Sequence, residues 1–321
     1  MQKFYLSFVF LLVFLTFSFS SYLLFSGNNS SMIFSPLPSF LTVFTNKQVS
    51  GIDLWFPNGE DIREVVFGNE APDISATSVL IYDLTDDKSL YEKNSKIKLP
   101  MASLTKVMTA IVALENPKTD DSYHIADSDL VGENSMGLTS GEVLSLEELL
   151  YGLILPSGND AAEALASNYP GGRSEFINAM NEKTKALGLS NTHFTNPSGL
   201  EGDGDQYTTA YDLLVITRYA LSKFPLFKEV VSAVEKELPY SSSHKYFYLY
   251  NETNLLTSYP GVKGVKTGYT PEAGLCLITY LDYREHEVIG VLLGSQNRRQ
   301  EMKDLLDYSL TKQGVNPPPH D

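Results

Sequence analysis

LPMASLTKVMTAIVALE, residues 99–115, joins a Ser-x-x-Lys pattern to a strongly apolar helix. Apolar residues cover nearly every face of Val107–Leu114, which indicates a helix buried on all sides. Ser103 opens this helix, where its hydroxyl would feel the positive end of the helix dipole. Lys106 follows three residues later, so the two side chains lie on one face. We therefore expect this helix in the core, with a reactive pair at its start.

Ser103 and Lys106 have the properties of a nucleophile and its general base. Burial disfavours the ammonium form of a lysine, and a second lysine nearby would disfavour it further. A neutral lysine amine can then accept the serine proton. The same pattern also begins at Ser95, Ser242 and Ser309. Only the copy at Ser103 opens a buried helix, and we expect the copy at Ser309 to be an ordinary helix end.

A second motif, Ser157-Gly158-Asn159, lies between two expected helices. Pro156 and Gly158 favour a tight turn there. One interpretation is a helix N-cap supplied by Ser157 or Asn159. The other is a functional turn that directs the Ser157 hydroxyl and the Asn159 amide into a cleft. The same three letters also occur at Ser26, outside the expected domain.

A third motif, Lys266-Thr267-Gly268, lies at the end of an expected strand, residues 262–267. A lysine ammonium and a threonine hydroxyl can bind a carboxylate. Gly268 would let the backbone of a ligand approach closely. If the strand lies at a sheet edge, it could also pair with an extended peptide. The alternative is a lysine on an exposed edge strand.

The order of predicted elements indicates an α+β fold. Strands are expected at 78–82, 89–92, 262–267, 275–282 and 287–293. Helices are expected at 107–114, 146–155, 161–166, 175–187, 210–221 and 298–310. Because strands occupy both ends and helices the middle, we predict one antiparallel sheet that joins the first and last strands, flanked by helices, with a helical region inserted between them.

Residues 1–26 form a candidate membrane anchor or signal peptide. Phe4–Phe25 contains no charge and is long enough to cross a bilayer. Lys3 predicts that the N-terminus stays inside and the rest lies outside. Cleavage as a signal peptide is the alternative, because Ser18 and Ser20 form a small-x-small pattern. Both interpretations place the rest of the chain in the extracytoplasmic space.

Three further segments follow this one. Residues 27–72 are rich in Ser, Asn, Pro and Gly and are interpreted as a linker. Residues 73–314 contain all three motifs and are interpreted as one domain. Residues 315–321, with three consecutive prolines, form a tail.

Composition excludes several classes of function. The 321 residues carry a formal net charge of −15 and have a pI near 4.8. This acidity argues against nucleic-acid binding and against binding of anionic lipids through a basic cluster. Cys276 is the one cysteine, so no intramolecular disulfide can form, and we expect a buried structural thiol. The five histidines show no zinc-ligand spacing, so neither a metal nor a cofactor is expected.

At these motifs the chain resembles the low-molecular-mass penicillin-binding proteins, the serine D-alanyl-D-alanine carboxypeptidases. The likeness spans about residues 78–310. Besides the stretch 99–115, it includes residues 149–159, 191–200 and 264–274. The resemblance implies a serine β-lactamase/transpeptidase-like fold. It also implies the bacterial cell envelope as location, peptidoglycan stem peptides as substrates and β-lactam antibiotics as covalent inhibitors.

The resemblance implies a role for each motif residue. Ser103 would form the acyl-ester and Lys106 would accept its proton. Ser157 would relay a proton to the leaving D-alanine amine, and Asn159 would hold the substrate amide.

The third motif has its own implied roles. Lys266 and Thr267 would bind the terminal carboxylate of the substrate, and Gly268 would leave room for its backbone. The backbone N–H groups of Ser103 and Tyr269 would form the oxyanion hole.

Several alternatives stay open. The same fold could support a D,D-endopeptidase or a β-lactamase, and the latter would need a second carboxylate base. An alternative of another class is a non-catalytic penicillin-binding sensor or wall-binding module. Many family members carry a second β-domain and a C-terminal amphipathic anchor, and we expect the N-terminal segment to replace that anchor here.

Overall fold

The central sheet combines strands from both ends of the sequence. The computed structural model describes residues 70–320. Five antiparallel strands run in the order β2-β1-β9-β8-β7, so β7 lies at one edge. The pairing of β1 with β9 confirms the predicted union of the first and last strands. The strands are β1 (Ser78–Asp83), β2 (Lys88–Lys93), β7 (Val262–Thr270), β8 (Gly274–Tyr283) and β9 (His286–Ser295).

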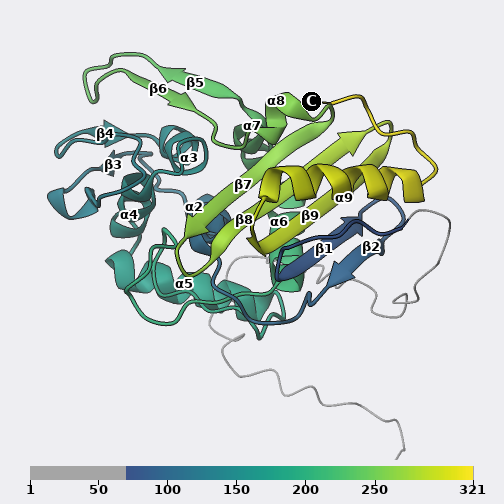
Figure 1. The fold of residues 1–321 in the computed structure, drawn as a ribbon. Helices are drawn as coiled ribbons and strands as arrows, with labels where there is room; N and C mark the ends of the chain where they lie inside the picture. The colour runs from purple at the N-terminus through teal and green to yellow at the C-terminus, as the bar shows by residue number, and fades with distance from the viewer. Residues whose placement is uncertain (1–69, 321) are drawn as a thin grey trace, which may run out of the picture. The chain divides into compact units, whose positions relative to one another are not determined.

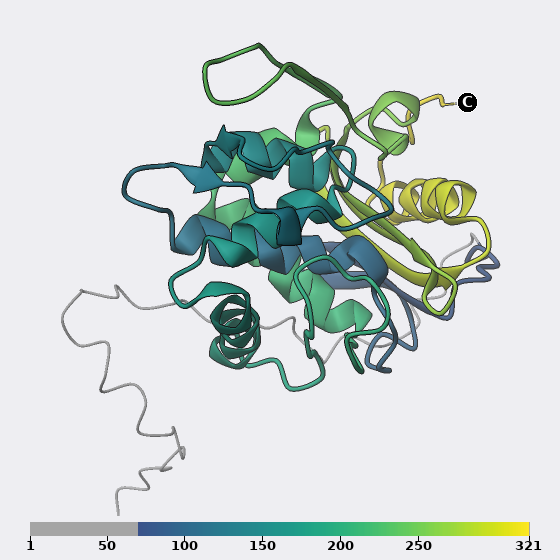
Figure 2. The same ribbon diagram turned by 90° about the vertical axis from the view of Figure 1, so that its left-hand side faces the viewer.

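Helices cover both faces of this sheet. Figure 1 shows α9 across the face nearer the viewer and α6 behind the sheet, with the remaining long helices to one side. Figure 2 shows the same layers from the side of the helical region. The α+β class with an inserted helical region is therefore confirmed. The long helices are α2 (Lys106–Glu115), α3 (Leu146–Ile154), α4 (Asn159–Ser167), α5 (Gly172–Ala186), α6 (Ala210–Lys223) and α9 (Arg298–Lys312).

Several shorter elements were not predicted. The strands β3 and β4 have two residues each, which is too short for an alternating pattern. The unpredicted elements are η2 (Ala102–Thr105), η3 (Asp127–Asp129), α7 (Pro225–Ser232), α8 (Leu255–Ser258), β3 (Tyr123–His124), β4 (Val143–Leu144), β5 (Glu235–Leu238) and β6 (Phe247–Tyr250).

The sheet separates two hydrophobic cores. Alternate residues of β1 point to opposite faces because the side-chain period of a strand is two. Leu80 and Tyr82 belong to the larger core with the inserted helices. Val79 and Ile81 belong to the smaller core beneath α9. The sheet is thus the middle layer of three.

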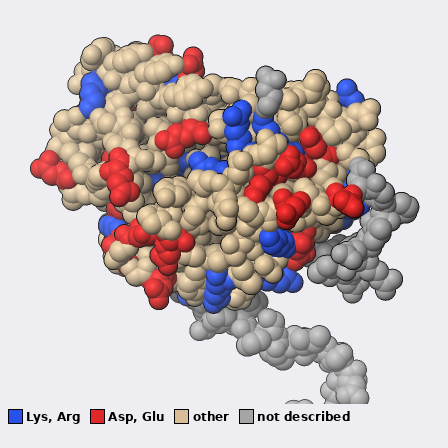
Figure 3. All heavy atoms as spheres, viewed as in Figure 1, with Lys and Arg blue, Asp and Glu red and all other residues tan. Residues whose placement is uncertain are grey.

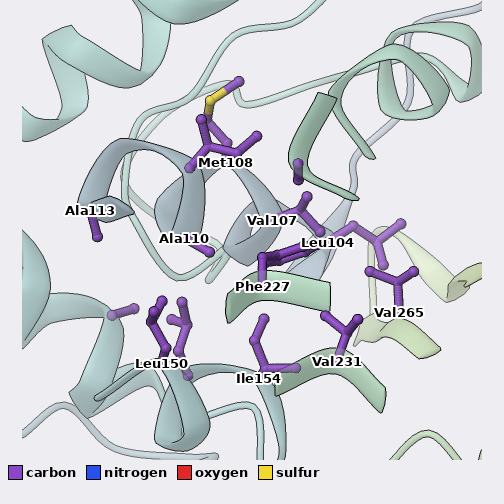
Figure 4. Packing of buried hydrophobic residues seen from close by; sticks show 14 of the residues in the cluster. Leu104, Val107, Met108, Ala110, Ala113, Leu150, Ile154, Phe227, Val231 and Val265 are labelled. Atoms are coloured by element: carbon purple, nitrogen blue, oxygen red, sulfur yellow. The ribbon is translucent and has the colours of Figure 1, made fainter. Parts of the chain in front are cut away.

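Helix α2 lies inside the larger core, as its apolar faces predicted. Val107 is fully buried. Figure 4 shows Leu104 and Val107 beside Phe227, with Val231 and Val265 close by. Helix α2 therefore packs among α3, α4, α5 and α6, while η2 before it packs against the edge strand β7, and this packing fixes the position of the first turn.

The start of this helix differs from the prediction in one respect. Ser103 does not open the α-helix, because a 3₁₀ turn, η2, comes first and α2 begins at Lys106. Such turns are common at helix ends, and in them the side chains at i and i+3 are eclipsed. Ser103 and Lys106 therefore still share one side of the turn, through 3₁₀ rather than α-helical geometry.

Within residues 70–320, no helix combines the length and the hydropathy needed to cross a bilayer. The apolar segment 4–25 and most of the expected linker 27–72 lie outside the described residues.

Candidate active site

The three motifs meet where η2, the turn before α4 and strand β7 come together. The Lys106 Nζ atom lies 3.0 Å from Ser103 Oγ and 2.7 Å from Asn159 Oδ1. Lys266 of β7 is close enough for its charge to lower the pKa of Lys106. Both lysine side chains are almost completely buried. The structure therefore brings together residues that are more than 150 positions apart in the sequence.

The hydrogen bonds of Lys106 determine what its amine can do. Its Nζ donates to Asn159 Oδ1 and, at 2.6 Å, to the carbonyl oxygen of Ser198. Both of these oxygens can only accept hydrogen bonds. A neutral amine has two N–H bonds, and these two acceptors use both of them. Its lone pair is then left for the third neighbour, the Ser103 hydroxyl, at 3.0 Å.

Burial favours this neutral form. The pKa of Lys106 lies well below that of an ordinary lysine, first because the side chain is desolvated and second because Lys266 is nearby. More distant carboxylates oppose this shift, but the direction remains downward. In its neutral form, Lys106 thus presents its lone pair to the candidate nucleophile.

The Ser157-Gly158-Asn159 turn is not a side-chain cap. The N-cap of α4 is Gly158, so neither Ser157 nor Asn159 caps the helix, and the first-turn N–H of Ala161 donates to the Asp160 carboxylate instead. Ser157 is buried and has a φ of +61°, a conformation that an L-residue adopts only when its surroundings impose it. A Cβ atom on Gly158 would lie 2.7 Å from the Gly152 carbonyl oxygen. Close packing of this glycine holds the turn against α3.

Strand β7 carries the third motif along the sheet edge. Lys266 is not exposed, in contrast to the alternative of a surface lysine, and Thr267 is also buried. The pKa of Lys266 is lowered to about 8, chiefly because the side chain is buried. The negative charge of Glu252 opposes this shift, and the positive charge of Arg298 adds to it. Tyr269, by contrast, is 62% exposed. The strand thus presents a buried cation in the site and an aromatic ring at its rim.

Gly268 lets β7 run directly against η2. A Cβ atom at this position would lie 3.2 Å from the Ser103 nitrogen and 3.2 Å from the Met101 carbonyl oxygen. The backbone N–H groups of Ser103 and Tyr269, the two expected oxyanion-hole donors, therefore belong to adjoining segments.

Arg298, at the start of α9, was missed in the sequence. Its Nη1 donates to the Gly268 carbonyl oxygen at 2.6 Å and to the Cys276 carbonyl oxygen at 3.4 Å. The Gly268 carbonyl and the Tyr269 N–H belong to one planar peptide unit. By holding the carbonyl, Arg298 fixes the direction in which the Tyr269 N–H points.

The loop that contains Ser198 was also given no role in the sequence, although its residues were part of the resemblance. Asn196 organises it: its Oδ1 accepts from the N–H groups of Ser198 and Gly199, and its Nδ2 donates to the Leu200 carbonyl oxygen. This side chain is 1% exposed. The only signal available was an Asn-Pro-x-Gly turn, which does not reveal that a carbonyl from the turn reaches Lys106.

The chain is similar to proteins of one known family. The Peptidase_S11 family, described as D-alanyl-D-alanine carboxypeptidase, matches residues 65–297. The D-alanyl-D-alanine carboxypeptidase DacF of Bacillus subtilis is 34% identical over 254 residues, which cover 75% of this chain and 64% of DacF. A D-alanyl-D-alanine endopeptidase of Pseudomonas aeruginosa is 33% identical over 212 residues, covering 64% of this chain and 67% of that protein. The chain thus spans about two thirds of the length of these relatives.

Solved structures agree with the fold. The crystal structure of the Streptomyces K15 DD-transpeptidase superimposes with a TM-score of 0.71 at 32% sequence identity. The superposition covers 76% of this chain and 100% of that one. The serine transpeptidase-like fold predicted above is thereby confirmed.

Proposed function

The chain belongs to the S11 family of D-alanyl-D-alanine carboxypeptidases, and from this premise we propose that it removes the terminal D-alanine from peptidoglycan stem pentapeptides. The observation that carries the proposal is the hydrogen bonding of Lys106. Two acceptors use its N–H bonds, and its lone pair faces Ser103 Oγ at 3.0 Å. A serine activated by a neutral amine is suited to acyl transfer.

Acylation starts at Ser103. Its Oγ attacks the carbonyl carbon of the penultimate D-alanine while its proton passes to Lys106 Nζ. The oxyanion accepts hydrogen bonds from the N–H groups of Ser103 and Tyr269. The C–N bond then breaks, and Ser157 relays a proton to the leaving amine. Water then attacks the ester carbonyl and passes a proton to Lys106, Ser103 Oγ takes that proton back as its bond to the peptide breaks, and the shortened peptide leaves.

Recognition of the substrate falls to Asn159 and β7. Because Asn159 Oδ1 accepts from Lys106, its Nδ2 is left to donate to the substrate amide. Lys266 and Thr267 bind the terminal carboxylate, and the edge of β7 pairs with the extended peptide. A β-lactam that presents a carboxylate next to a reactive carbonyl would follow the same path and stay bound to Ser103.

The location follows from the substrate. Peptidoglycan lies outside the cytoplasmic membrane, so the domain acts in the bacterial cell envelope. We propose that residues 4–25 either anchor the chain in the membrane or are cleaved as a signal peptide.

Mass spectrometry after incubation with penicillin tests the nucleophile. We expect a covalent adduct on Ser103, no adduct in Ser103→Ala, and a normal adduct in Ser309→Ala. The last variant is a matched control because Ser309 begins the same tetrapeptide, Ser-Leu-Thr-Lys, on α9. Release of free D-alanine from a D-Ala-D-Ala pentapeptide tests turnover. An adduct without any D-alanine release would favour the sensor over the enzyme.

A further inference from the structure

Strand β6 carries a row of exposed tyrosines. Tyr246, Tyr248 and Tyr250 alternate with two buried residues, and they are 39%, 54% and 52% exposed. Tyr240, in the connection between β5 and β6, is 79% exposed, and its ring centroid lies 6.0 Å from that of Tyr246. These four side chains are called the tyrosine row. On a solvated strand face, polar residues are the usual choice, so exposed aromatic rings at period two indicate a binding surface.

The opposite face of this hairpin is fixed to the domain. Phe247 and Leu249 are 4% and 2% exposed and belong to the larger core. On β5, the Lys236 ammonium lies 4.1 Å from the centre of the Tyr151 ring of α3. Figure 1 shows the β5–β6 hairpin extending beyond the sheet beside α3. Because its inner face is anchored, the hairpin holds the tyrosine row outward.

Carboxylates flank the row. Glu235 lies directly opposite Tyr250, and Glu237 lies opposite Tyr248. The Tyr248 hydroxyl also donates a hydrogen bond to Glu235. These charges repel anionic lipids and anionic polymers. An uncharged sugar polymer fits better, because the negative ring faces attract its C–H groups and the carboxylates accept hydrogen bonds from its hydroxyls.

The row is continuous with the wall of the candidate active site. Two residues after Tyr250, the Glu252 N–H donates to the carbonyl oxygen of Leu155, which lies two residues before Ser157. The charge of Glu252 acts on both Lys106 and Lys266. The strand therefore leads from the candidate active site along the hairpin.

Dimensions favour a polymer attached to the substrate. From Tyr246, just before β6, to Tyr250, the row extends over about 13 Å at the usual rise of a strand. A stem pentapeptide, when extended, reaches about 17 Å. We propose that the tyrosine row binds the glycan strand of peptidoglycan, the chain of uncharged amino sugars that carries the stem peptide. This inference rests on the proposed function for the identity of the polymer.

Co-sedimentation with insoluble chitin, an uncharged polymer of amino sugars, tests the proposal. The full-length protein in detergent is compared with Y246S/Y248S/Y250S and with the ring-preserving Y246F/Y248F/Y250F. We expect the serine variant to bind roughly tenfold more weakly or worse, since buried aromatic anchors dominate binding. The phenylalanine variant should bind nearly as the parent does. The single variant Y248S, with a smaller loss, serves if the triple serine variant does not fold.

Two further measurements separate the possible outcomes. D-alanine release from a free pentapeptide should be the same in all variants. Because glycan binding is measured independently of this release, the test of the tyrosine row stays valid even if the proposed function fails. Soluble chitin oligosaccharides should displace the protein, and polyglutamate should not. Equal sedimentation of parent and serine variants, or displacement by polyglutamate alone, would overturn the proposal.

Discussion

The base at Lys106 should give acylation a distinct pH profile. Only the neutral amine can accept the Ser103 proton, so the rate should rise with pH through the lowered pKa of Lys106, and it should fall again above about pH 8, where Lys266 loses the charge that binds the carboxylate. Because the Lys266 charge contributes to that lowering, Lys266→Met should move the rising part of the pH profile to higher pH. Acylation rates measured with a fluorescent penicillin between pH 5 and pH 10 check this.

Lys263 provides the matched control for this experiment. It lies on the same strand, three residues earlier, and its side chain is exposed. Lys263→Met should therefore leave the rising part of the pH profile unchanged. If the rising part of the pH profile does not move in Lys266→Met, or moves equally in both variants, the two buried lysines are not electrostatically coupled.

Which residues could be predicted depends on whether a side chain or the backbone supplies the contact. Ser103, Lys106 and Lys266 were predicted because their chemistry is carried by their side chains. The Ser198 carbonyl was not, since every residue has a carbonyl and only the folded loop aims this one at Lys106. Arg298 was missed for a similar reason, because its partner is the Gly268 carbonyl on another element.

On the scale of elements, the loop that follows α5 is pressed against η2 at Gly199. This residue has a φ of +88°, and a Cβ atom there would lie 2.0 Å from the Ala102 carbonyl oxygen and 3.0 Å from the Ser103 nitrogen. Gly199→Ala should push the loop and η2 apart. We expect acylation by a fluorescent penicillin to fall roughly 100-fold, because a displacement of about 1 Å at a reacting group can have that effect.

Gly202→Ala separates this clash from backbone strain. Gly202 also has a positive φ, +107°, but no atom lies within 4 Å of the position of its Cβ. Both variants should lose some thermal stability, since alanine is strained at positive φ. Only Gly199→Ala should lose acylation. If both variants acylate at the parental rate, the loop does not position Ser103 and Lys106.

Elements were predictable where their periodicity was long enough to detect. The five strands of the central sheet and the six long helices have clear apolar patterns. The hairpin of β5 and β6 was missed because Tyr-Phe-Tyr-Leu-Tyr reads as a continuous apolar run, although its tyrosines are exposed. The 3₁₀ turn η2 was missed because its residues also suit an α-helix, and only packing against β7 selects the tighter turn.

The whole molecule depends on contacts between the two ends of the domain. Thr77 Oγ1 donates to the Gly294 carbonyl oxygen, 217 positions away in the sequence. The order of strands along the sheet was not predictable from their apolar patterns, which do not specify neighbours. That order places β7 at the edge, where Gly268 can meet Ser103.

The surface agrees with the acidic composition. Figure 3 shows acidic and basic side chains interspersed over one face, with no continuous basic stripe on that face. The net charge of −15 over the whole chain favours solubility and disfavours polyanions as partners. The sequence alone supported this conclusion, because net charge does not depend on the fold.

The choice between a terminal D-alanine and a cross-link is the remaining question at this scale. A carboxylate beside the scissile bond can take charge-assisted hydrogen bonds from Lys266 and Thr267, about twice as strong as neutral ones. Its loss would leave a buried cation unpaired, which costs about 1–3 kcal/mol, or up to roughly 100-fold in rate. A cross-linked substrate can also keep a carboxylate near its scissile bond, so the preference is one of degree.

A competition assay decides between the two. A D-Ala-D-Ala pentapeptide and a cross-linked muropeptide dimer are supplied together, and free D-alanine and residual dimer are measured by chromatography. We expect release of D-alanine to be faster than loss of the dimer. Lys266→Ala should slow the pentapeptide reaction roughly 100-fold, because the terminal carboxylate of the substrate loses the lysine that binds it. Lys263→Ala should not slow the reaction, because Lys263 is exposed on β7. Faster loss of the dimer would instead identify an endopeptidase, the activity named for the Pseudomonas aeruginosa relative.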